Sequence, residues 1–168
     1  MTHSLTSKIL GLLVLSLGAC QFAQVAYADA PSPLSADQVQ HLNKDTFEPL
    51  KTVASWPESV KEYYRSSLKS KDLSKEFADP GKPFEAGCVR TADGPPDMGF
   101  MLGAKSGALC IINYQIGGFA LRDMVDIFEL KDHSAQRLVS KALYPGHAAD
   151  LKQLLEQLRK DPILTKTH

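Results

Sequence analysis

The spacing of hydrophobic residues is helical over the first part of the chain that follows residue 35. Between residues 36 and 47 the apolar positions recur at a loosely helical interval, and Pro49 marks a break. Ser35 and Gln38 have the spacing of a capping box, in which the serine side chain accepts a hydrogen bond from the helix backbone. This pattern predicts a helix over residues 36–47.

A second helical stretch follows Ser55. Ser55 and Glu58 again have capping-box spacing, and Pro57 between them suits the first helical turn, where no backbone N–H is needed. Trp56 is expected to anchor this helix to the body of the domain. The apolar face of the helix is predicted to hold Val60, Tyr63, Tyr64 and Leu68.

From Phe77 onward the pattern becomes that of short strands separated by turn residues. The predicted strands cover residues 86–91, 98–104, 108–116 and 119–130. Residues 136–144 fit either a helix or a fifth strand, and a strand is favoured because Tyr144, Pro145 and Gly146 end the segment abruptly. An apolar stripe at helical spacing then predicts a helix from Asp150 to Lys160, and Pro162 ends it.

Gly117 and Gly118 predict a two-residue hairpin turn, because such turns need positive φ angles. This turn places Ile116 opposite Phe119 and gives the sheet one apolar face and one partly wet face. The wet face is then predicted to carry Asn113, Gln115, Arg122 and Asp126. Asn113 and Arg122 lie opposite each other in this register. The group is a candidate polar binding face, although a merely solvated sheet face explains the same pattern.

These elements predict one α+β domain over residues 35–168. It has N-terminal helices, an antiparallel sheet of four to five strands connected as a β-meander, and a C-terminal helix packed on one face. The length fits a single domain with a sizeable core.

The first thirty residues have the pattern of an export signal. Lys8 precedes an apolar run over residues 9–17, which is too short for a membrane anchor. Two processing sites remain open. Ala26-Tyr27-Ala28 favours cleavage before Asp29, giving a signal peptide over residues 1–28 and a linker over residues 29–34.

The segment Leu17-Gly18-Ala19-Cys20 resembles the bacterial lipobox instead. That resemblance implies a lipoprotein signal over residues 1–19 with Cys20 as the lipidated residue, and Gln21 resembles the outer-membrane sorting pattern. We therefore expect an exported protein, either periplasmic or an outer-membrane lipoprotein. Contact with the membrane is expected only through the lipid anchor.

The charge balance excludes partners that a strong global field would attract. Nineteen basic and nineteen acidic residues give a formal net charge of zero, so no nucleic-acid partner is expected.

Two cysteines remain in the predicted domain after export. Cys88 and Cys110 form an even pair in an oxidising compartment and are therefore predicted to form a disulfide. The alternative is a pair of buried free thiols.

The remaining patterns do not assemble a catalytic site. GFMLGAKS over residues 99–106 is close to a phosphate-binding loop, but the strand-like residues after Ser106 predict a bend between two strands. No cofactor is expected, and no spacing of metal ligands is present. His133, Asp132 and His147 would have to converge in the fold to act together. We therefore expect a non-catalytic envelope protein that binds a protein partner or small ligand, for example an inhibitor or immunity factor. The alternative is a small envelope hydrolase whose catalytic residues are assembled only by folding.

Overall fold

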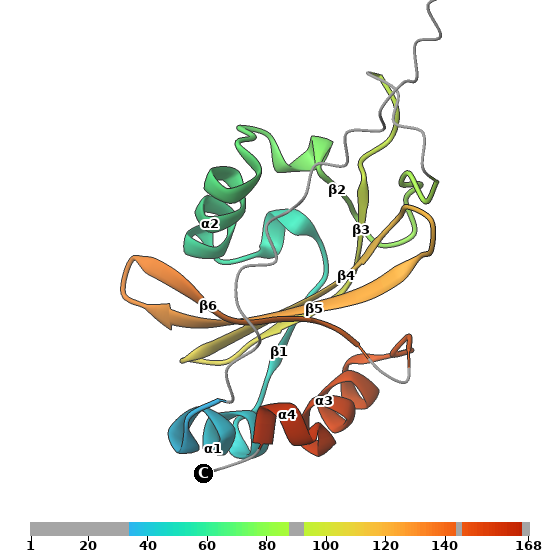
Figure 1. Cartoon of the computed structure of the whole chain (residues 1–168). Coiled ribbons are helices and arrows are strands. Elements are labelled where there is room, and N and C mark those ends of the chain that lie inside the picture. The colour runs from blue at the N-terminus through green and yellow to red at the C-terminus, as the bar shows by residue number, and fades with distance from the viewer. Residues whose placement is uncertain (1–33, 88–92, 144–145, 166–168) are drawn as a thin grey trace, which may run out of the picture.

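The structure is a computed structural model that describes residues 34–87, 93–143 and 146–165. A twisted sheet lies between two layers of helices (Figure 1). The strands of the described part are β1 Glu48–Leu50, β2 Phe77–Ala78, β3 Met98–Lys105, β4 Leu109–Ile116, β5 Arg122–Lys131 and β6 Ser134–Ala142. The predicted α+β architecture is confirmed, with six strands in the described sheet instead of four or five.

The sheet is organised around an antiparallel meander. Strands β3 to β6 pair consecutively, as predicted, and the ambiguous segment before residue 144 is strand β6. Two short strands join the outer edge of β3: β1 pairs with it antiparallel and β2 pairs with it parallel. Pro49 lies on β1, where a residue without an N–H is tolerated because the strand is at an edge. The predicted strand over residues 86–91 falls mostly on residues outside the described ranges.

Helix α1, Ala36–Lys44, begins as predicted. The Gln38 backbone N–H donates to Ser35 Oγ at 3.3 Å, and the Ser35 N–H donates to Gln38 Oε1 at 2.9 Å. The second predicted capping box is wrong, because α2 spans Glu58–Leu68 and its N-cap residue is Pro57. Ser55 belongs instead to the preceding 3-10 turn η1, Val53–Ser55. Pro57 disfavours helical backbone in Trp56, the residue before it, so the helix does not extend back to Ser55.

Helix α2 covers one face of the sheet, called here the α2 face. Trp56 anchors α2 to the sheet, as predicted: it is buried, and its ring centroid lies 5.0 to 5.3 Å from those of Tyr64, Phe77 and Phe100. The aromatic side chains of this cluster are Trp56, Tyr64, Phe77, Phe100, Tyr114 and Phe128. A second 3-10 turn, η2 Leu73–Lys75, leads into β2.

The opposite face, called here the α3 face, is covered by α1, α3 Leu151–Lys160 and α4 Pro162–Thr165. Leu154 and Leu158 pack against Ile111, Val125 and Ile127 of the sheet. The predicted helix over Asp150 to Lys160 is confirmed, with Asp150 as its N-cap. Helices cover both faces of the central strands, so the prediction of one partly wet face is wrong for Asn113 and Asp126, which are buried.

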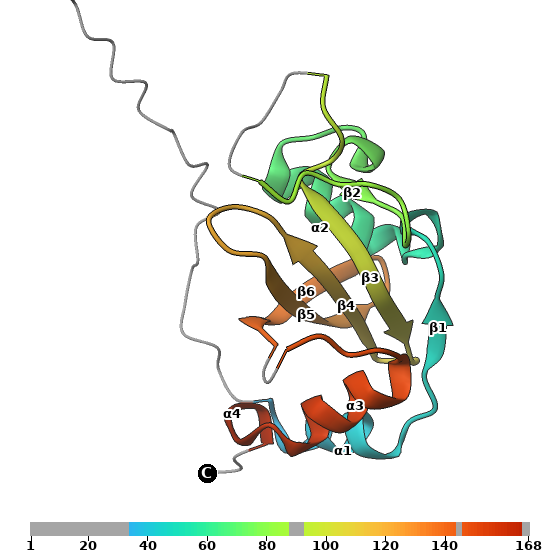
Figure 2. The ribbon, with the colours of Figure 1, turned by 90° about the vertical axis from the view of Figure 1, so that its right-hand side faces the viewer.

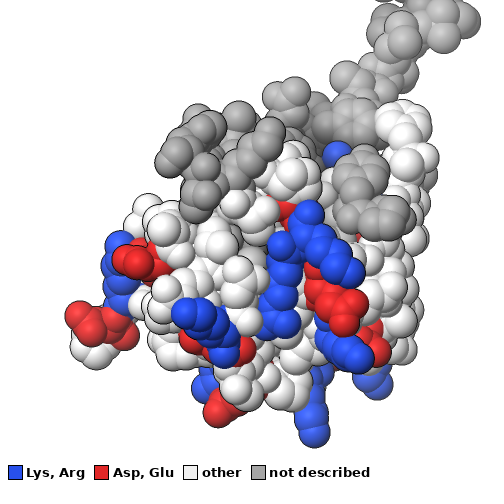
Figure 3. Space-filling model, turned by 90° about the horizontal axis from the view of Figure 1, so that it is seen from below, with Lys and Arg blue, Asp and Glu red and all other residues white. Residues whose placement is uncertain are grey.

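The outer surface of the α3 face carries acidic and basic side chains side by side (Figure 3). Several of these charges are paired; Lys131 Nζ, for example, lies 2.6 Å from Glu129 Oε2. Among the helices of the described ranges, none has the length and apolarity needed to cross a bilayer.

Candidate functional site

The GFMLGAKS segment lies on β3 and in the hairpin that follows it. Lys105 is the last residue of β3, and no helix begins there, which confirms the predicted bend between two strands. The turn lies over residues 106–109, where Ser106 N–H donates to the Leu109 carbonyl at 2.8 Å and Leu109 N–H donates to Ser106 Oγ at 3.2 Å. The Lys105 ammonium lies 3.6 Å from Glu48 Oε2. This segment therefore lacks the helix N-terminus that a phosphate-binding loop needs.

The connection from β4 to β5 differs from the predicted two-residue turn. Ile116 pairs with Arg122, so residues 117–121 form a five-residue loop and the register is shifted by three residues. Gly117 has a packing role here. A Cβ atom on it would overlap the Glu85 carbonyl oxygen and would lie 2.6 Å from the Ala86 carbonyl carbon. The glycine therefore permits a close backbone approach.

The shifted register separates the four residues predicted to form a polar face. Asn113 pairs with Val125 on the α3 face, whereas Asp126 pairs with Ile112 on the α2 face. Asn113 and Asp126 are both fully buried, and only Arg122 is exposed at the end of β5. Asn113 Nδ2 donates to the Met124 carbonyl at 2.9 Å. An odd shift in register moves side chains to the opposite face, so these residues do not share one wet surface.

Asp126 forms a buried cluster beneath α2. Tyr64 Oη donates to Asp126 Oδ2 at 2.7 Å, and Arg137 Nη1 lies 3.6 Å from the same oxygen. Burial raises the pKa of Asp126, while hydrogen bonds from Ser140 and Tyr64 and the charge of Arg137 act in the opposite direction. Burial and the nearby carboxylate raise the pKa of Tyr64 well above its ordinary value. The cluster thus ties α2 to the central strands.

The candidate catalytic residues of the hydrolase alternative do not converge. Asp132 and His133 lie in the turn between β5 and β6, where Asp132 has a φ of 39°. His147 Nδ1 lies 3.7 Å from Asp123 Oδ1, near the other end of β5. The ten residues of β5 separate the two places by about 30 Å. Within the described ranges, no three His, Cys, Asp or Glu side chains are grouped to hold a metal ion.

The residues that do come together lie at the end of the sheet next to the 117–121 loop. Gly99, Gln115 and Asp123 are directly opposite one another on β3, β4 and β5. They continue the α3 face beyond the helices, and Figure 2 shows this end of β3 and β4 without a helix in front of it. This row of residues is the floor of the candidate site.

Residues 84–86 cross this end of the sheet. The Phe84 ring lies on Gly99, where a Cβ atom would come within 2.6 Å of the ring. The Glu85 N–H donates to the Pro96 carbonyl at 2.7 Å, and the Gly118 N–H donates to the Ala86 carbonyl at 3.3 Å. Because Gly99 and Gly117 have no side chains, residues 84–86 lie directly on the backbone of β3 and of the 117–121 loop.

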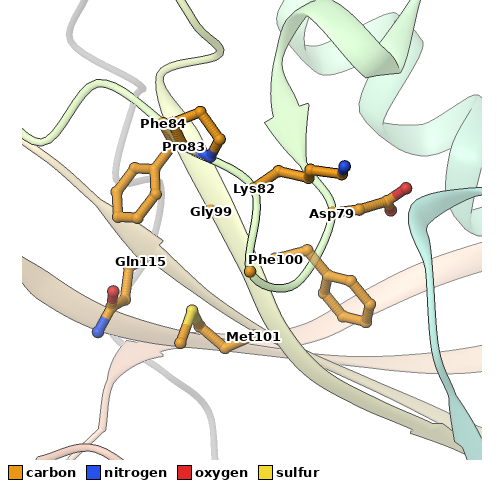
Figure 4. Close-up of a pocket in the computed structure, with 9 residues that line it drawn as sticks. Asp79, Lys82, Pro83, Phe84, Gly99, Phe100, Met101 and Gln115 are labelled. Atoms are coloured by element: carbon orange, nitrogen blue, oxygen red, sulfur yellow. The ribbon is translucent and has the colours of Figure 1, made fainter.

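A cavity of about 430 Å³ opens beside residues 84–86. Phe84, Gln115 and Met101 lie around Gly99, and Phe100 and Asp79 lie on the other side of the β3 ribbon (Figure 4). Lys82 and Pro83 complete the rim. Met101 is displaced from regular alternation by a β-bulge between Phe100 and Leu102. Such bulges redirect a side chain.

The polar side of the cavity is held in a fixed orientation. Gln115 Nε2 donates to Asp123 Oδ1 at 3.0 Å, and His147 Nδ1 lies 3.7 Å from that carboxylate oxygen. A carboxylate only accepts hydrogen bonds, so the nitrogen of the Gln115 amide must face Asp123. The Gln115 Oε1 atom is then the acceptor that remains for a ligand.

The neighbouring loop exposes large apolar side chains. Phe119 is 86% exposed and Leu121 is 50% exposed, and apart from Ile163 on α4 they are the large hydrophobic residues that the described structure leaves exposed. The predicted two-residue turn would instead put Phe119 and Leu121 on the apolar face of the sheet, with Phe119 opposite Ile116. The isolated glycine at position 99, inside a predicted strand, was the available indication that another segment approaches the backbone here.

The predicted disulfide is not tested by the structure. Cys110 is a free, buried thiol on β4, and burial raises its pKa to about 12. Cys88 lies outside the described residues, as does Cys20 with the whole export segment. The pairing of Cys88 with Cys110 therefore stays a prediction.

Comparisons of the chain with models of known protein families, with curated proteins and with solved structures found no match.

Proposed function

We propose that this chain is a non-catalytic binding protein of the bacterial cell envelope, which contacts a protein partner through the end of the sheet formed by the 117–121 loop. The proposal rests mainly on the exposure of Phe119 and Leu121 at that loop. Aromatic side chains are enriched at the centres of protein interfaces, where they contribute a large share of the binding free energy.

The support of the loop favours a binding role over a simple surface irregularity. Gly117 packs against the backbone of residues 85 and 86, and the Gly118 N–H donates to Ala86. A loop held at its base has less backbone conformational entropy to lose on association than an unsupported one. This arrangement suits a small inhibitor or immunity protein, which must present a contact surface without undergoing chemistry.

The envelope location derives from the export pattern. In the proposal the chain is either released into the periplasm after cleavage before Asp29 or anchored to the outer membrane by a lipid on Cys20. Membrane-bound material that shifts in mass with globomycin, and that becomes soluble in Cys20→Ala, would support the anchor. Soluble wild-type protein beginning at Asp29 would refute it.

The partner is tested by affinity capture from the native envelope with three forms of the protein. Wild type is compared with a double variant, Phe119→Ser with Leu121→Ser, and with Ile163→Ser as a matched control, since Ile163 is 49% exposed on the remote helix α4. We expect one partner to be retained by wild type and by the control. Truncating an aromatic side chain at the centre of an interface typically costs about 2 kcal/mol of binding free energy, which weakens binding about 30-fold. The double variant should therefore lose the partner.

Retention of the same protein by the double variant would refute the role of the loop. Hydrolysis of envelope polymers by the purified wild type would refute the non-catalytic class. Size-exclusion chromatography of each form identifies the case in which the partner is a second copy of this chain.

A further inference from the structure

We propose that the cavity beside residues 84–86 receives one uncharged apolar side chain of a partner polypeptide, together with the N–H of the peptide bond next to that side chain. The inference rests on the proposed function, because it assigns the chemistry of the partner at the same end of the sheet. The cavity and the exposed loop share a wall, since residues 84–86 lie between Gly99 on the cavity floor and Gly117 at the base of the loop.

The apolar part of the assignment follows from the lining. The ring of Phe84, which lies on Gly99, lines the cavity together with the side chain of Met101 and with Pro83. At about 430 Å³ the cavity is at the small end of the range for ligand sites, about 300 to 1,000 Å³. A space of this size and lining suits a single large side chain, and the thioether of Met101 adapts to irregular shapes.

The absence of charge on the occupant follows from the balance of the rim. Asp79 and Lys82 line the cavity with one charge of each sign. Asp79 Oδ1 already accepts a hydrogen bond from the Val53 N–H at 2.7 Å. Asp123, on the floor next to Gln115, already accepts a hydrogen bond from the Gln115 amide at 3.0 Å, with His147 Nδ1 3.7 Å away. A cation entering the cavity would therefore lose hydration and find both carboxylates already engaged, and an anion would meet two carboxylates beside the single ammonium of Lys82.

The peptide N–H is assigned by the fixed amide of Gln115. Its nitrogen is directed to Asp123, so it offers Oε1 as an acceptor at the edge of an apolar space. A polypeptide supplies a donor at a fixed distance from every side chain, which a hydrocarbon or a lipid chain does not. A side chain in the cavity with its backbone at Gln115 thus satisfies both features at once.

The experiment is a titration of the full mature protein with small peptide probes. Binding is monitored through the backbone amide chemical shifts of the protein in NMR spectra. The probe is N-acetyl-L-phenylalaninamide, which is uncharged and has both the side chain and the N–H. N-acetylglycinamide lacks the side chain, and N-acetyl-L-phenylalanine carries a negative charge. We expect saturable shifts at Gly99, Met101 and Gln115 with the first probe, in the millimolar range, and much weaker effects with the other two.

Gln115→Met keeps the length of the side chain and removes the acceptor. This substitution should lower the affinity for the phenylalaninamide probe about two- to tenfold, which is the effect of losing one hydrogen bond. Gln136→Met on β6 is the matched control and should leave binding unchanged. Gln136 is exposed, and its Oε1 accepts a hydrogen bond from Lys131 Nζ at 3.4 Å. A preserved amide spectrum away from the cavity shows that each variant is folded.

Several results would overturn the assignment. These are no saturable shift with the phenylalaninamide probe, equal binding of the glycinamide or the anionic probe, or equal affinity of wild type and Gln115→Met. If the probe binds as expected while capture from the envelope fails, the cavity assignment stands and the proposed partner does not. If capture depends on the loop while no probe binds, the cavity assignment alone is wrong.

Discussion

Replacing Tyr64 by phenylalanine removes a single hydroxyl group beneath α2 and leaves the ring among its aromatic neighbours. The lost group is the donor of the 2.7 Å hydrogen bond to Asp126 Oδ2. Tyr64 and Asp126 are both buried, so water does not replace the lost donor. The free energy of unfolding should fall by an amount that depends on the charge of Asp126.

The magnitude follows from the protonation state of the acid. When Asp126 is ionised, the hydrogen bond has a charged acceptor and contributes about 1.5 to 3 kcal/mol. When Asp126 is protonated, the bond is neutral and contributes about 0.5 to 1.5 kcal/mol. The destabilisation by Tyr64→Phe should therefore be larger at high pH than at low pH.

The pH range follows from the direction of the shift. Burial raises the pKa of Asp126 in the folded protein above its ordinary value of 3.8. The unfolded chain then loses this proton first as the pH rises, so the contribution of Asp126 to stability is full below pH 3.8 and decreases until the folded-state pKa is passed. Asp126→Asn, which has no such titration, isolates this contribution when it is compared with wild type.

The assay is urea denaturation followed by the fluorescence of Trp56, the single tryptophan of the chain. Wild type, Tyr64→Phe, Asp126→Asn and the double variant are measured from acidic to mildly alkaline pH. In the Asp126→Asn background, the Tyr64→Phe change should cost only about 0.5 to 1.5 kcal/mol at every pH, because the acceptor is neutral. A cost of Tyr64→Phe in wild type that is the same at all pH values would refute the reasoning.

Three further predictions test other parts of the structure. Gly117→Ala should destabilise the protein by about 1 to 3 kcal/mol, because its Cβ would overlap the backbone of residues 85 and 86, whereas Gly107→Ala, with nothing within 4 Å, should cost little; urea denaturation compares them. Cys110, whose pKa burial raises to about 12, should resist iodoacetamide in the native protein at pH 8 and react in urea without a reductant, as read by mass spectrometry; a need for dithiothreitol would instead demonstrate the disulfide with Cys88. Ser35→Ala should lower the free energy of unfolding by about 1 kcal/mol through loss of the α1 N-cap, and no change in the urea midpoint would contradict the capping assignment.

Much of the fold was predictable because local rules decide it. The Ser35 cap, the leucine stripe of α3 and the meander all follow from patterns within about ten residues. The short strands β1 and β2 were not predictable in the same way. A strand of two or three residues has no periodicity, and it exists because an edge of β3 is available to pair with it.

The candidate site was missed because the register of β4 and β5 was inferred from the turn alone. Gly117 and Gly118 are typical of a tight turn. In the structure, however, Gly117 packs against the backbone of residues 85 and 86, which are distant in sequence. The sequence of β4 nevertheless argued against the predicted wet face, because residues 109–114 are apolar except for Asn113. Residues from Leu109 to Tyr114 are all buried, and such a run is typical of a strand covered on both faces, which leaves no wet face for Asn113.

The backbone hydrogen bond from the Leu34 N–H to the Leu164 carbonyl, at 3.2 Å, closes the described domain into a loop. A segment that starts and finishes at one point is well suited to circular permutation or to transplantation into a surface loop of a host protein. New termini at the exposed turn of Asp132 and His133 would leave the Phe119 loop intact. The architecture therefore makes this domain a portable module for engineered fusions.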